Sequence, residues 1–191
     1  MFAEEHLSHI LKIFGEEKTK EILSNFVCEK NKEVEKFLID KAISHEKHNL
    51  ARTMLIFDKS NGNLVGYYSI SIKSFVISSK ISTSIKKKFF GTSQTNGKVI
   101  PAILIGQLGK NDAVKSSFTG THLMDYIFRY IVKMHEKAAS VIAYVEHDDK
   151  DELVAYYEKH GFDYFARKDE EERGLYCHMI KTENIIKAVK E

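Results

Sequence analysis

The spacing of apolar residues predicts helices in the first quarter of the chain. Leu7, Ile10, Leu11 and Phe14 recur at the three- and four-residue intervals of one helix face. We therefore interpret residues 4–14 and 16–26 as helical, with Gly15 between them. A further helix is predicted after Asn31, a favoured N-cap residue, and one side of it would carry Val34, Phe37, Leu38, Lys41 and Ala42.

A β-hairpin is predicted next. Residues 53–57 and 64–76 are rich in β-branched and aromatic residues, and the turn sequence Ser-Asn-Gly-Asn at 60–63 separates them. Residues 78–98 show no clear periodicity. They are rich in Ser, Thr and Lys, and they leave an exposed strand and a mobile loop as alternatives. A lysine run such as Lys86–Lys88 is most often a solvated face.

The middle of the chain joins an apolar strand to an amphipathic helix. The apolar run 100–109 leads into a polar loop, 110–119, and Gly120 opens a helix over 121–135. A loop of this kind at a helix N-terminus can direct backbone N–H groups at a phosphate. The pattern predicts a nucleotide-type cofactor.

The sequence of the last quarter of the chain predicts a strand and a helix, followed by two strands and a final helix. Residues 141–146 form a short strand, and Asp149 with Glu152 resembles a capping box that opens a helix ending at Gly161. Strands over 162–166 and 174–181 and a helix over 183–190 follow. The order predicts an α/β (α+β) domain with a mixed sheet flanked by helices. We expect one domain over 1–191, with residues 1–25 as a helical N-terminal extension.

Composition limits the cellular compartment and the classes of binding partner that we expect for the protein. The chain has 43% hydrophobic and 29% charged residues and a formal charge of +2, so its overall field does not indicate a nucleic-acid binder. Cys28 and Cys177 lie far apart and suggest two buried free thiols. The first residues lack the pattern of a signal peptide, and no apolar run reaches the ~20 residues of a membrane helix. We expect a cytoplasmic protein without membrane contact.

Two segments resemble the GNAT superfamily of acetyl-CoA-dependent N-acetyltransferases. Residues 157–162, Tyr-Glu-Lys-His-Gly-Phe, are similar to the signature F-Y-x-x-x-G-F when Tyr156 is included. Residues 107–124 align without a gap against R-L-A-V-D-x-S-x-Q-G-x-G-x-G-x-x-L-L. The resemblance spans about residues 26–181. It implies a GNAT-like domain whose mostly antiparallel sheet splays at its central strands.

Further segments resemble the branch that contains the acetyltransferase toxins of bacterial toxin–antitoxin pairs. These are Phe-Val-Cys-Glu-Lys-Asn at 26–31, Phe-Leu at 37–38, residues 42–56, and Val-Gly-Tyr-Tyr-Ser at 65–69. Toxins of that branch acetylate the α-amine of aminoacyl-tRNA. The resemblance therefore implies acetyl-CoA as cosubstrate and a primary amine as acceptor, with aminoacyl-tRNA as one candidate. An antitoxin protein and a second copy of the chain are candidate partners.

The cofactor loop departs from the family pattern. Lys115 stands where the family has Gln or Arg, and Ser116 and Phe118 replace two glycines, so that Gly120 alone remains. Backbone N–H groups still bind phosphate when side chains point outward, but Phe118 would crowd a close approach. The cofactor-binding residues that the resemblance implies are Leu108, Gly109, Lys110, Lys115, Ser116, Ser117, Phe118, Thr119, Gly120 and Thr121.

The resemblance also assigns chemistry to side chains. Tyr157 occupies the position of the general acid, and a main-chain N–H near Leu108 to Lys110 would polarise the thioester carbonyl. Glu146 and His147 are candidate bases, although an amine that arrives neutral needs none. Arg52 is a candidate substrate contact. The histidine spacings do not converge on a metal site, so no metal is expected.

Alternatives remain at this point. The lysines at 86–88 and the pair Lys110 and Lys115 could form a phosphate-binding patch for aminoacyl-tRNA. A small-molecule or protein amine is the alternative acceptor. A GNAT-like module that binds acyl-CoA or a partner without chemistry is the non-enzymatic alternative, which the loss of loop glycines favours.

Overall fold

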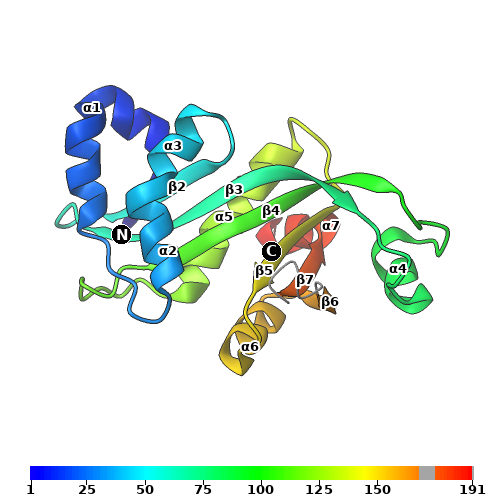
Figure 1. Cartoon of the computed structure of the whole chain (residues 1–191). Coiled ribbons are helices and arrows are strands. Elements are labelled where there is room, and N and C mark those ends of the chain that lie inside the picture. The colour runs from blue at the N-terminus through cyan, green and yellow to red at the C-terminus, as the bar shows by residue number, and fades with distance from the viewer. Residues whose placement is uncertain (168–174, 191) are drawn as a thin grey trace. The chain divides into compact units, whose positions relative to one another are not determined.

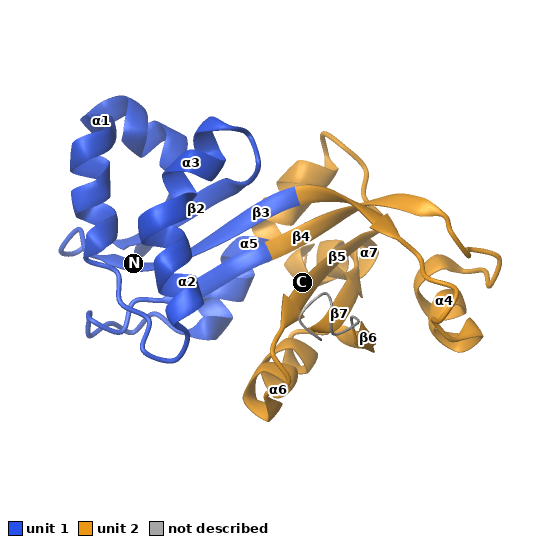
Figure 2. Ribbon diagram, in the orientation of Figure 1, with its two compact units in different colours: residues 1–71, 106–127 blue, residues 72–105, 128–191 orange. Residues whose placement is uncertain are grey.

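The computed structural model describes residues 1–167 and 175–190. The chain forms a seven-stranded sheet in the order β1-β2-β3-β4-β5-β7-β6, with helices between the strands (Figure 1). It divides into two compact units (Figure 2). Unit 1 contains residues 1–71 and 106–127, and unit 2 contains residues 72–105 and 128–191.

Unit 1 begins with a strand rather than a helix. β1 (Phe2–His6) pairs antiparallel with β2 (Arg52–Asp58), from Phe2 opposite Asp58 to His6 opposite Met54. The predicted helix over 4–14 is therefore wrong for residues 4–6, because pairing with β2 overrides their local helix propensity. β3 (Leu64–Val76) continues the sheet with the bounds that the sequence predicted.

The first helix, α1 (Leu7–Ser24), contains the break that Gly15 predicts. Gly15 has φ 78° and ψ 172°, a conformation that a residue with a Cβ avoids. His6 caps the helix, since its ring nitrogen accepts a hydrogen bond from the Ser8 amide (3.2 Å). Leu7, Ile10 and Leu23 are buried in the core of unit 1.

A second helical region follows in three pieces. These are α2 (Lys32–Lys36), a π-helical turn η1 (Phe37–Lys41) and α3 (Ala42–Lys47). Asn31 is the N-cap, as predicted, and accepts a hydrogen bond from the Glu33 amide (3.0 Å). Val34, Leu38 and Ala42 are buried, but Lys41 is exposed, because the π-helical turn changes the periodicity of the buried face.

Unit 2 contains the parallel step of the sheet. β4 (Val99–Lys110) pairs in parallel with β5 (Ile142–His147) at Ala102–Leu104 and Ile142–Tyr144. β7 (Tyr176–Lys181) pairs antiparallel with β5 and with β6 (Asp163–Arg167). The fold class predicted from the sequence, a mixed and mostly antiparallel sheet with flanking helices, is confirmed. The predicted start of the last strand at Gly174 lies outside the described residues.

The unreadable segment 78–98 contains a helix, α4 (Thr83–Phe90). Ser82 caps its start, and Gly91 ends it with φ 70°. Neither predicted alternative, strand or loop, is correct here. The lysine run is not a uniform solvated face either: Lys86 is only 4% exposed, and its ammonium donates to the Ser79 carbonyl (3.2 Å) and to Asn96 Oδ1 (2.7 Å).

The remaining helices are α5 (Gly120–His135), α6 (Asp151–Lys159) and α7 (Thr182–Lys190). The N-cap of α6 is Lys150, which makes no side-chain cap, so the predicted capping box at Asp149 is wrong. Gly161 follows the end of α6 with φ 82°, as expected for a C-terminal glycine. No helix within residues 1–167 and 175–190 is long and apolar enough to cross a membrane.

Candidate active site

In unit 1, the loop predicted to bind the cofactor is anchored at its start by Asn111. This buried side chain accepts hydrogen bonds from the amides of Val27 (3.0 Å) and Ala113 (3.1 Å). Its own amide group donates to the carbonyls of Asn25 (3.0 Å) and Leu64 (2.8 Å). Asn111 therefore fixes the point at which β4 becomes the loop, a role that the sequence analysis missed.

Gly109 precedes this anchor and packs closely against helix α2. A Cβ at Gly109 would lie 2.7 Å from Cγ1 of Val34 and 3.3 Å from Cζ of Phe26. A side chain at this position would displace the core of unit 1. The structure thus gives Gly109 a packing role, and its part in cofactor binding stays a prediction.

The side chain of Phe118 points into the core of unit 1. Its ring is fully buried and packs edge-on against Phe2, with 5.0 Å between ring centroids. It also occupies the space beside Gly66, where an added Cβ would lie 2.8 Å from the ring. The crowding expected from a phenylalanine in the loop is therefore absent on the loop's outer side.

Two backbone amides at the start of α5 already have partners. The Phe118 amide donates to Ser116 Oγ (3.1 Å), and the Thr119 amide donates to His122 Nδ1 (3.1 Å). Thr119 Oγ1 in turn accepts from the His122 amide (3.3 Å), which makes a reciprocal cap. A phosphate bound here would replace the first two of these bonds, while the exposed Lys110 and Lys115 add positive charge beside the helix N-terminus.

In unit 2, Tyr157 is held in a cluster of aromatic rings. It lies in α6, is 5% exposed, and its ring centroid is 5.0 Å from that of His147 and 5.7 Å from that of Phe162. Among the residues that the structure describes, its hydroxyl has no hydrogen-bond partner. Burial, and secondarily the neighbouring Tyr156, raises the pKa of Tyr157 well above the usual value of a phenol. The hydroxyl is therefore protonated at neutral pH.

The two candidate bases lie on opposite faces of β5. His147 shares its face with Tyr157 and contacts His178 of β7, Nε2 to Nδ1, at 3.0 Å. Glu146 points to the other face, the one that carries Tyr144, whose pKa is raised first by burial and then by Glu146. The role of Glu146 as base stays a prediction. His178 is a site residue that the sequence analysis missed, although a histidine between buried residues of a strand was a signal.

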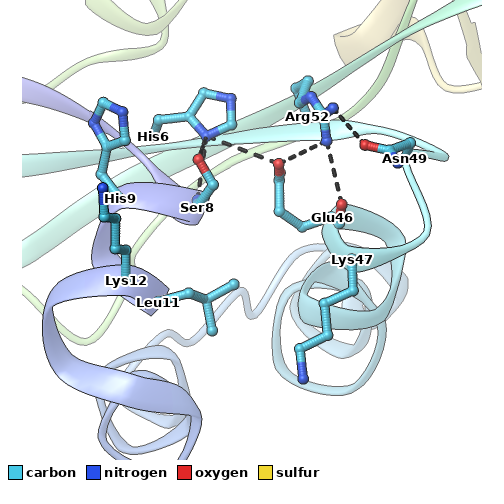
Figure 3. Close-up of a pocket in the computed structure, with 9 residues that line it drawn as sticks. All are labelled: His6, Ser8, His9, Leu11, Lys12, Glu46, Lys47, Asn49 and Arg52. Carbon is cyan, nitrogen blue, oxygen red and sulfur yellow. Dashed lines mark hydrogen bonds and ion pairs between the residues drawn. The ribbon is translucent and has the colours of Figure 1, made fainter.

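Arg52 lines a pocket of about 680 Å³ within unit 1 (Figure 3). Its guanidinium donates to Glu46 Oε1 (2.8 Å), to the Glu46 carbonyl (3.2 Å) and to Asn49 Oδ1 (2.6 Å). Glu46 is buried and also accepts from the Thr53 amide (3.1 Å). Most of the lining side chains are hydrogen-bond donors or cations: His6, Ser8, His9, Leu11, Lys12, Glu46, Lys47, Asn49 and Arg52.

One lysine of the predicted phosphate-binding patch is not on the surface. Lys86 is buried in α4, and Lys88 pairs with Asp163 at 2.8 Å. Because its side chain is buried, Lys86 cannot contribute to a phosphate-binding surface. Within the described part of the chain, no group of three or more His, Cys, Asp or Glu residues is placed to hold a metal ion.

Comparison with known proteins reveals similarity at the level of structure. No family model matches the chain, and no curated protein sequence matches it. A bacterial toxin structure aligns with 14% identity and a TM-score of 0.76, covering 100% of this chain and 96% of the toxin. A tyrosine-to-phenylalanine mutant of the toxin AtaT, bound to the C-terminus of the antitoxin AtaR and acetyl-CoA, aligns with 13% identity and a TM-score of 0.70, covering 100% and 99%.

A third structure shows AtaT complexed with acetyl-methionyl-tRNAfMet. It has 16% identity and a TM-score of 0.70, and it covers 97% of this chain and 98% of AtaT. At these identities the similarity extends to the fold. The chain therefore has the fold of these toxins along its whole length, as the resemblance in its sequence implied.

Proposed function

We propose that the protein is a cytoplasmic, acetyl-CoA-dependent N-acetyltransferase that acts on a primary amine, with aminoacyl-tRNA as the acceptor. The observation that carries this proposal is Tyr157: a buried and protonated phenol, at the signature position, in a chain with the fold of AtaT. Structures of AtaT contain acetyl-CoA in one case and acetyl-methionyl-tRNA in another. The first is an acetyl donor, and the second is an acetylated aminoacyl-tRNA.

The loop before α5 would hold the cofactor. Because the Phe118 ring lies in the core, it does not block the outer side of the loop. The N-terminus of α5 and the ammonium groups of Lys110 and Lys115 favour an anion such as a pyrophosphate. Bound acetyl-CoA would supply an acetyl group activated as a thioester. A loop that fits the cofactor is compatible with a non-catalytic acyl-CoA-binding module as well, and it is the retention of Tyr157 that argues against that alternative.

Tyr157 would act as the general acid. When the amine nitrogen bonds to the acetyl carbon, the C–S bond breaks and the leaving thiolate takes the Tyr157 proton, while the amine loses a proton of its own. A phenol with a pKa of about 10 is already some 2 kcal/mol too weak to protonate a thiolate of pKa about 8.5, and burial widens that gap for Tyr157. The transfer requires that the thiolate be desolvated as well, which raises its basicity in the same apolar surroundings.

Glu146 is the proposed base for the amine proton. Its side chain is on the face of β5 opposite to Tyr157, so the amine proton would reach it through water rather than directly. An amine that arrives neutral would need no base. Retained turnover in Glu146→Gln at pH 8.5 together with lost turnover at pH 6.5 would support the role of base.

Arg52 and its pocket are the proposed contact for the acceptor. The guanidinium is held by Glu46 and Asn49, and the pocket is rich in donors and cations, which suits an anionic substrate such as a nucleic-acid phosphate. This pocket replaces the lysine run at 86–88 as support for aminoacyl-tRNA. By analogy with the AtaT–AtaR complex, we propose an antitoxin protein as a partner.

One experiment tests the reaction and the acceptor together. Purified protein is given radiolabelled acetyl-CoA with aminoacyl-tRNAs, polyamines or peptides, and the label on each acceptor is measured. We expect label on aminoacyl-tRNA, and we expect Tyr157→Phe to lower turnover by about 10²–10⁴-fold. Affinity for acetyl-CoA should be unchanged, and the matched control, Tyr156→Phe, should keep most of the activity.

Other outcomes would decide against parts of this proposal. Label on polyamines or peptides alone would make the protein an acetyltransferase with another acceptor. Tight binding of acetyl-CoA without transfer would indicate a binding module. Normal turnover in Tyr157→Phe would remove Tyr157 as the acid, whichever acceptor is used.

A further inference from the structure

Two buried histidines on neighbouring strands of unit 2 form a pair, and one of them, His147, contacts Tyr157. His147 ends β5 and is 6% exposed, and His178 lies in the middle of β7 and is fully buried. Their ring centroids are 4.9 Å apart, and His147 Nε2 lies 3.0 Å from His178 Nδ1. Imidazoles are expensive to bury without partners, so a buried pair calls for an explanation.

The hydrogen bonds determine which nitrogen carries each proton. His147 Nδ1 lies 2.7 Å from the carbonyl of Asp148, which can only accept, so Nδ1 carries the hydrogen. In a neutral ring His147 Nε2 is then an acceptor, and His178 Nδ1 must be the donor. His178 Nε2 is left with a lone pair, buried and without a partner among the described residues.

His147, which is bonded to both the Asp148 carbonyl and His178, is the member of this hydrogen-bonded chain that contacts Tyr157. The His147 ring faces the Tyr157 ring at a centroid distance of 5.0 Å and an interplanar angle of 30°. Tyr157 cannot turn toward β5 without displacing His147, and His147 cannot turn without breaking its bond to His178. The orientation of the Tyr157 ring thus depends on a residue that does not touch it.

We propose that His147 and His178 are positioning residues for Tyr157: the donor at His178 Nδ1 locks the His147 ring, which sets the direction of the Tyr157 hydroxyl, and the lock holds while the pair is neutral. This inference rests on the proposed role of Tyr157 as general acid. It assigns no proton transfer to either histidine.

The surroundings of the pair explain why neutrality matters. The one nitrogen that can accept another proton is His178 Nε2, and a cation there would be buried. Burial, followed by the neighbouring His147, lowers the pKa of His178, whereas the carboxylates of Glu158 on α6 and Asp163 on β6 raise it by a smaller amount. The rings of Tyr164 and Tyr176 complete the contacts of the pair. Because the pKa of His178 is lowered, its protonation sets in below the ordinary pH 6.5 of an imidazole; the buried charge would then draw water into the cluster and release the lock.

Two substitutions of His178 separate the donor from the titrating group. His178→Asn offers an N–H near the position of Nδ1 but does not titrate, whereas His178→Phe keeps a ring and offers no donor. We expect kcat of His178→Asn within about fivefold of the parent, and kcat of His178→Phe at least tenfold lower, with acetyl-CoA affinity unchanged in both.

The pH profile provides the readout that a merely structural role would not change. The acceptor amine titrates equally in parent and variant, so the ratio of kcat for the parent to kcat for His178→Asn isolates the pair. We expect this ratio to be constant from pH 6.5 to 8.5 and to fall at lower pH, in the range in which NMR of the imidazole shows His178 of the parent becoming protonated. A ratio that stays flat while His178 becomes protonated would overturn the proposal, even if His178→Phe fails to fold.

A double substitution distinguishes this proposal from the one on which it rests. If the pair acts through the Tyr157 hydroxyl, adding His178→Phe to Tyr157→Phe should lower kcat little further. Full additivity of the two losses would overturn the positioning role. Unchanged turnover in Tyr157→Phe alone would instead refute Tyr157 as the acid.

Discussion

Asn111 shows how a single buried side chain can hold several backbone segments. Its amide group bonds two N–H donors and two carbonyls, and one of these carbonyls belongs to the buried Leu64. A buried group left unpaired costs more than the net value of its bond, because it has already lost its water.

Replacement of Asn111 by alanine should therefore lower the free energy of unfolding strongly. We expect a loss of about 2–4 kcal/mol, measured by urea denaturation, from the groups left unpaired. The matched control is Asn61→Ala, which removes one hydrogen bond in an exposed turn and should lower stability by less than about 1 kcal/mol. Equal losses in the two variants would contradict the anchoring role of Asn111.

Some residues of the candidate site and of the helix caps could be predicted from the sequence, and others could not. Tyr157 was proposed as the acid because it occupies the tyrosine position of the family signature, and Asn31 was predicted as an N-cap from the preference of asparagine for that position. The opposite directions of Glu146 and His147 follow from strand alternation once β5 is known. His178 could not be paired with His147, because nothing local indicates that β7 lies beside β5.

At the scale of elements, the loop before α5 combines a helix N-terminus with two exposed lysines. The positive charges of the two lysines and the dipole of α5 both favour the binding of an anion at this loop. Their contribution is partial, since each group is exposed to solvent and is screened by salt.

Lys115→Ala should weaken binding of acetyl-CoA without affecting the chemical step. We expect Kd to rise about two- to fivefold at low salt, in keeping with the ~0.3–1 kcal/mol of such interactions, and kcat to stay unchanged. Isothermal titration calorimetry measures the affinity. Lys87→Ala, an exposed lysine in α4, is the control and should bind as the parent does. A fall in kcat at unchanged affinity would contradict the proposed role of Lys115.

Elements with strong local patterns were predicted well, and those defined by distant partners were not. The bounds of β3 were predicted correctly because its β-branched and aromatic residues favour a strand on their own, whatever strands lie beside it. β1 was read as helix, since its pairing partner lies some fifty residues away. α4 is short, and its stability comes from packing of Phe89 in the core of unit 2 and from the buried Lys86.

At the scale of the whole molecule, the partly buried His6 and the fully buried His178 link stability to pH. Burial is the main cause that lowers the pKa of both His6 and His178 below 6.5. The unfolded chain therefore binds more protons than the folded one below about pH 6.5, and the free energy of unfolding falls as the pH decreases through this value.

This dependence can be removed without changing the fold. Asparagine at position 6 retains an N-cap acceptor for the Ser8 amide, and asparagine at position 178 retains a donor. The double variant His6→Asn/His178→Asn should show a flatter stability between pH 5 and 7 than the parent, measured by urea denaturation at each pH. A slope equal to that of the parent would assign the acid sensitivity to other groups.

The class of the fold followed from the order of helices and strands, whereas the order of strands in the sheet did not. Parallel pairing of β4 with β5 is expected of a strand–helix–strand unit. The insertion of β7 between β5 and β6 has no signal in the local sequence pattern, because it is set by pairing between segments that are distant in the chain.

The packing of Phe118 against Gly66 couples two positions that are far apart in the chain. The ring fills part of the volume that a side chain at residue 66 would need, and the Gly109 carbonyl oxygen lies 3.0 Å from the same Cβ position. A smaller residue at 118 would therefore remove only one of two obstacles, and Gly66→Ala would still press on the backbone of β4. The close approach of β3 to β4 at this point thus restricts residue 66 to glycine, whatever residue stands at 118.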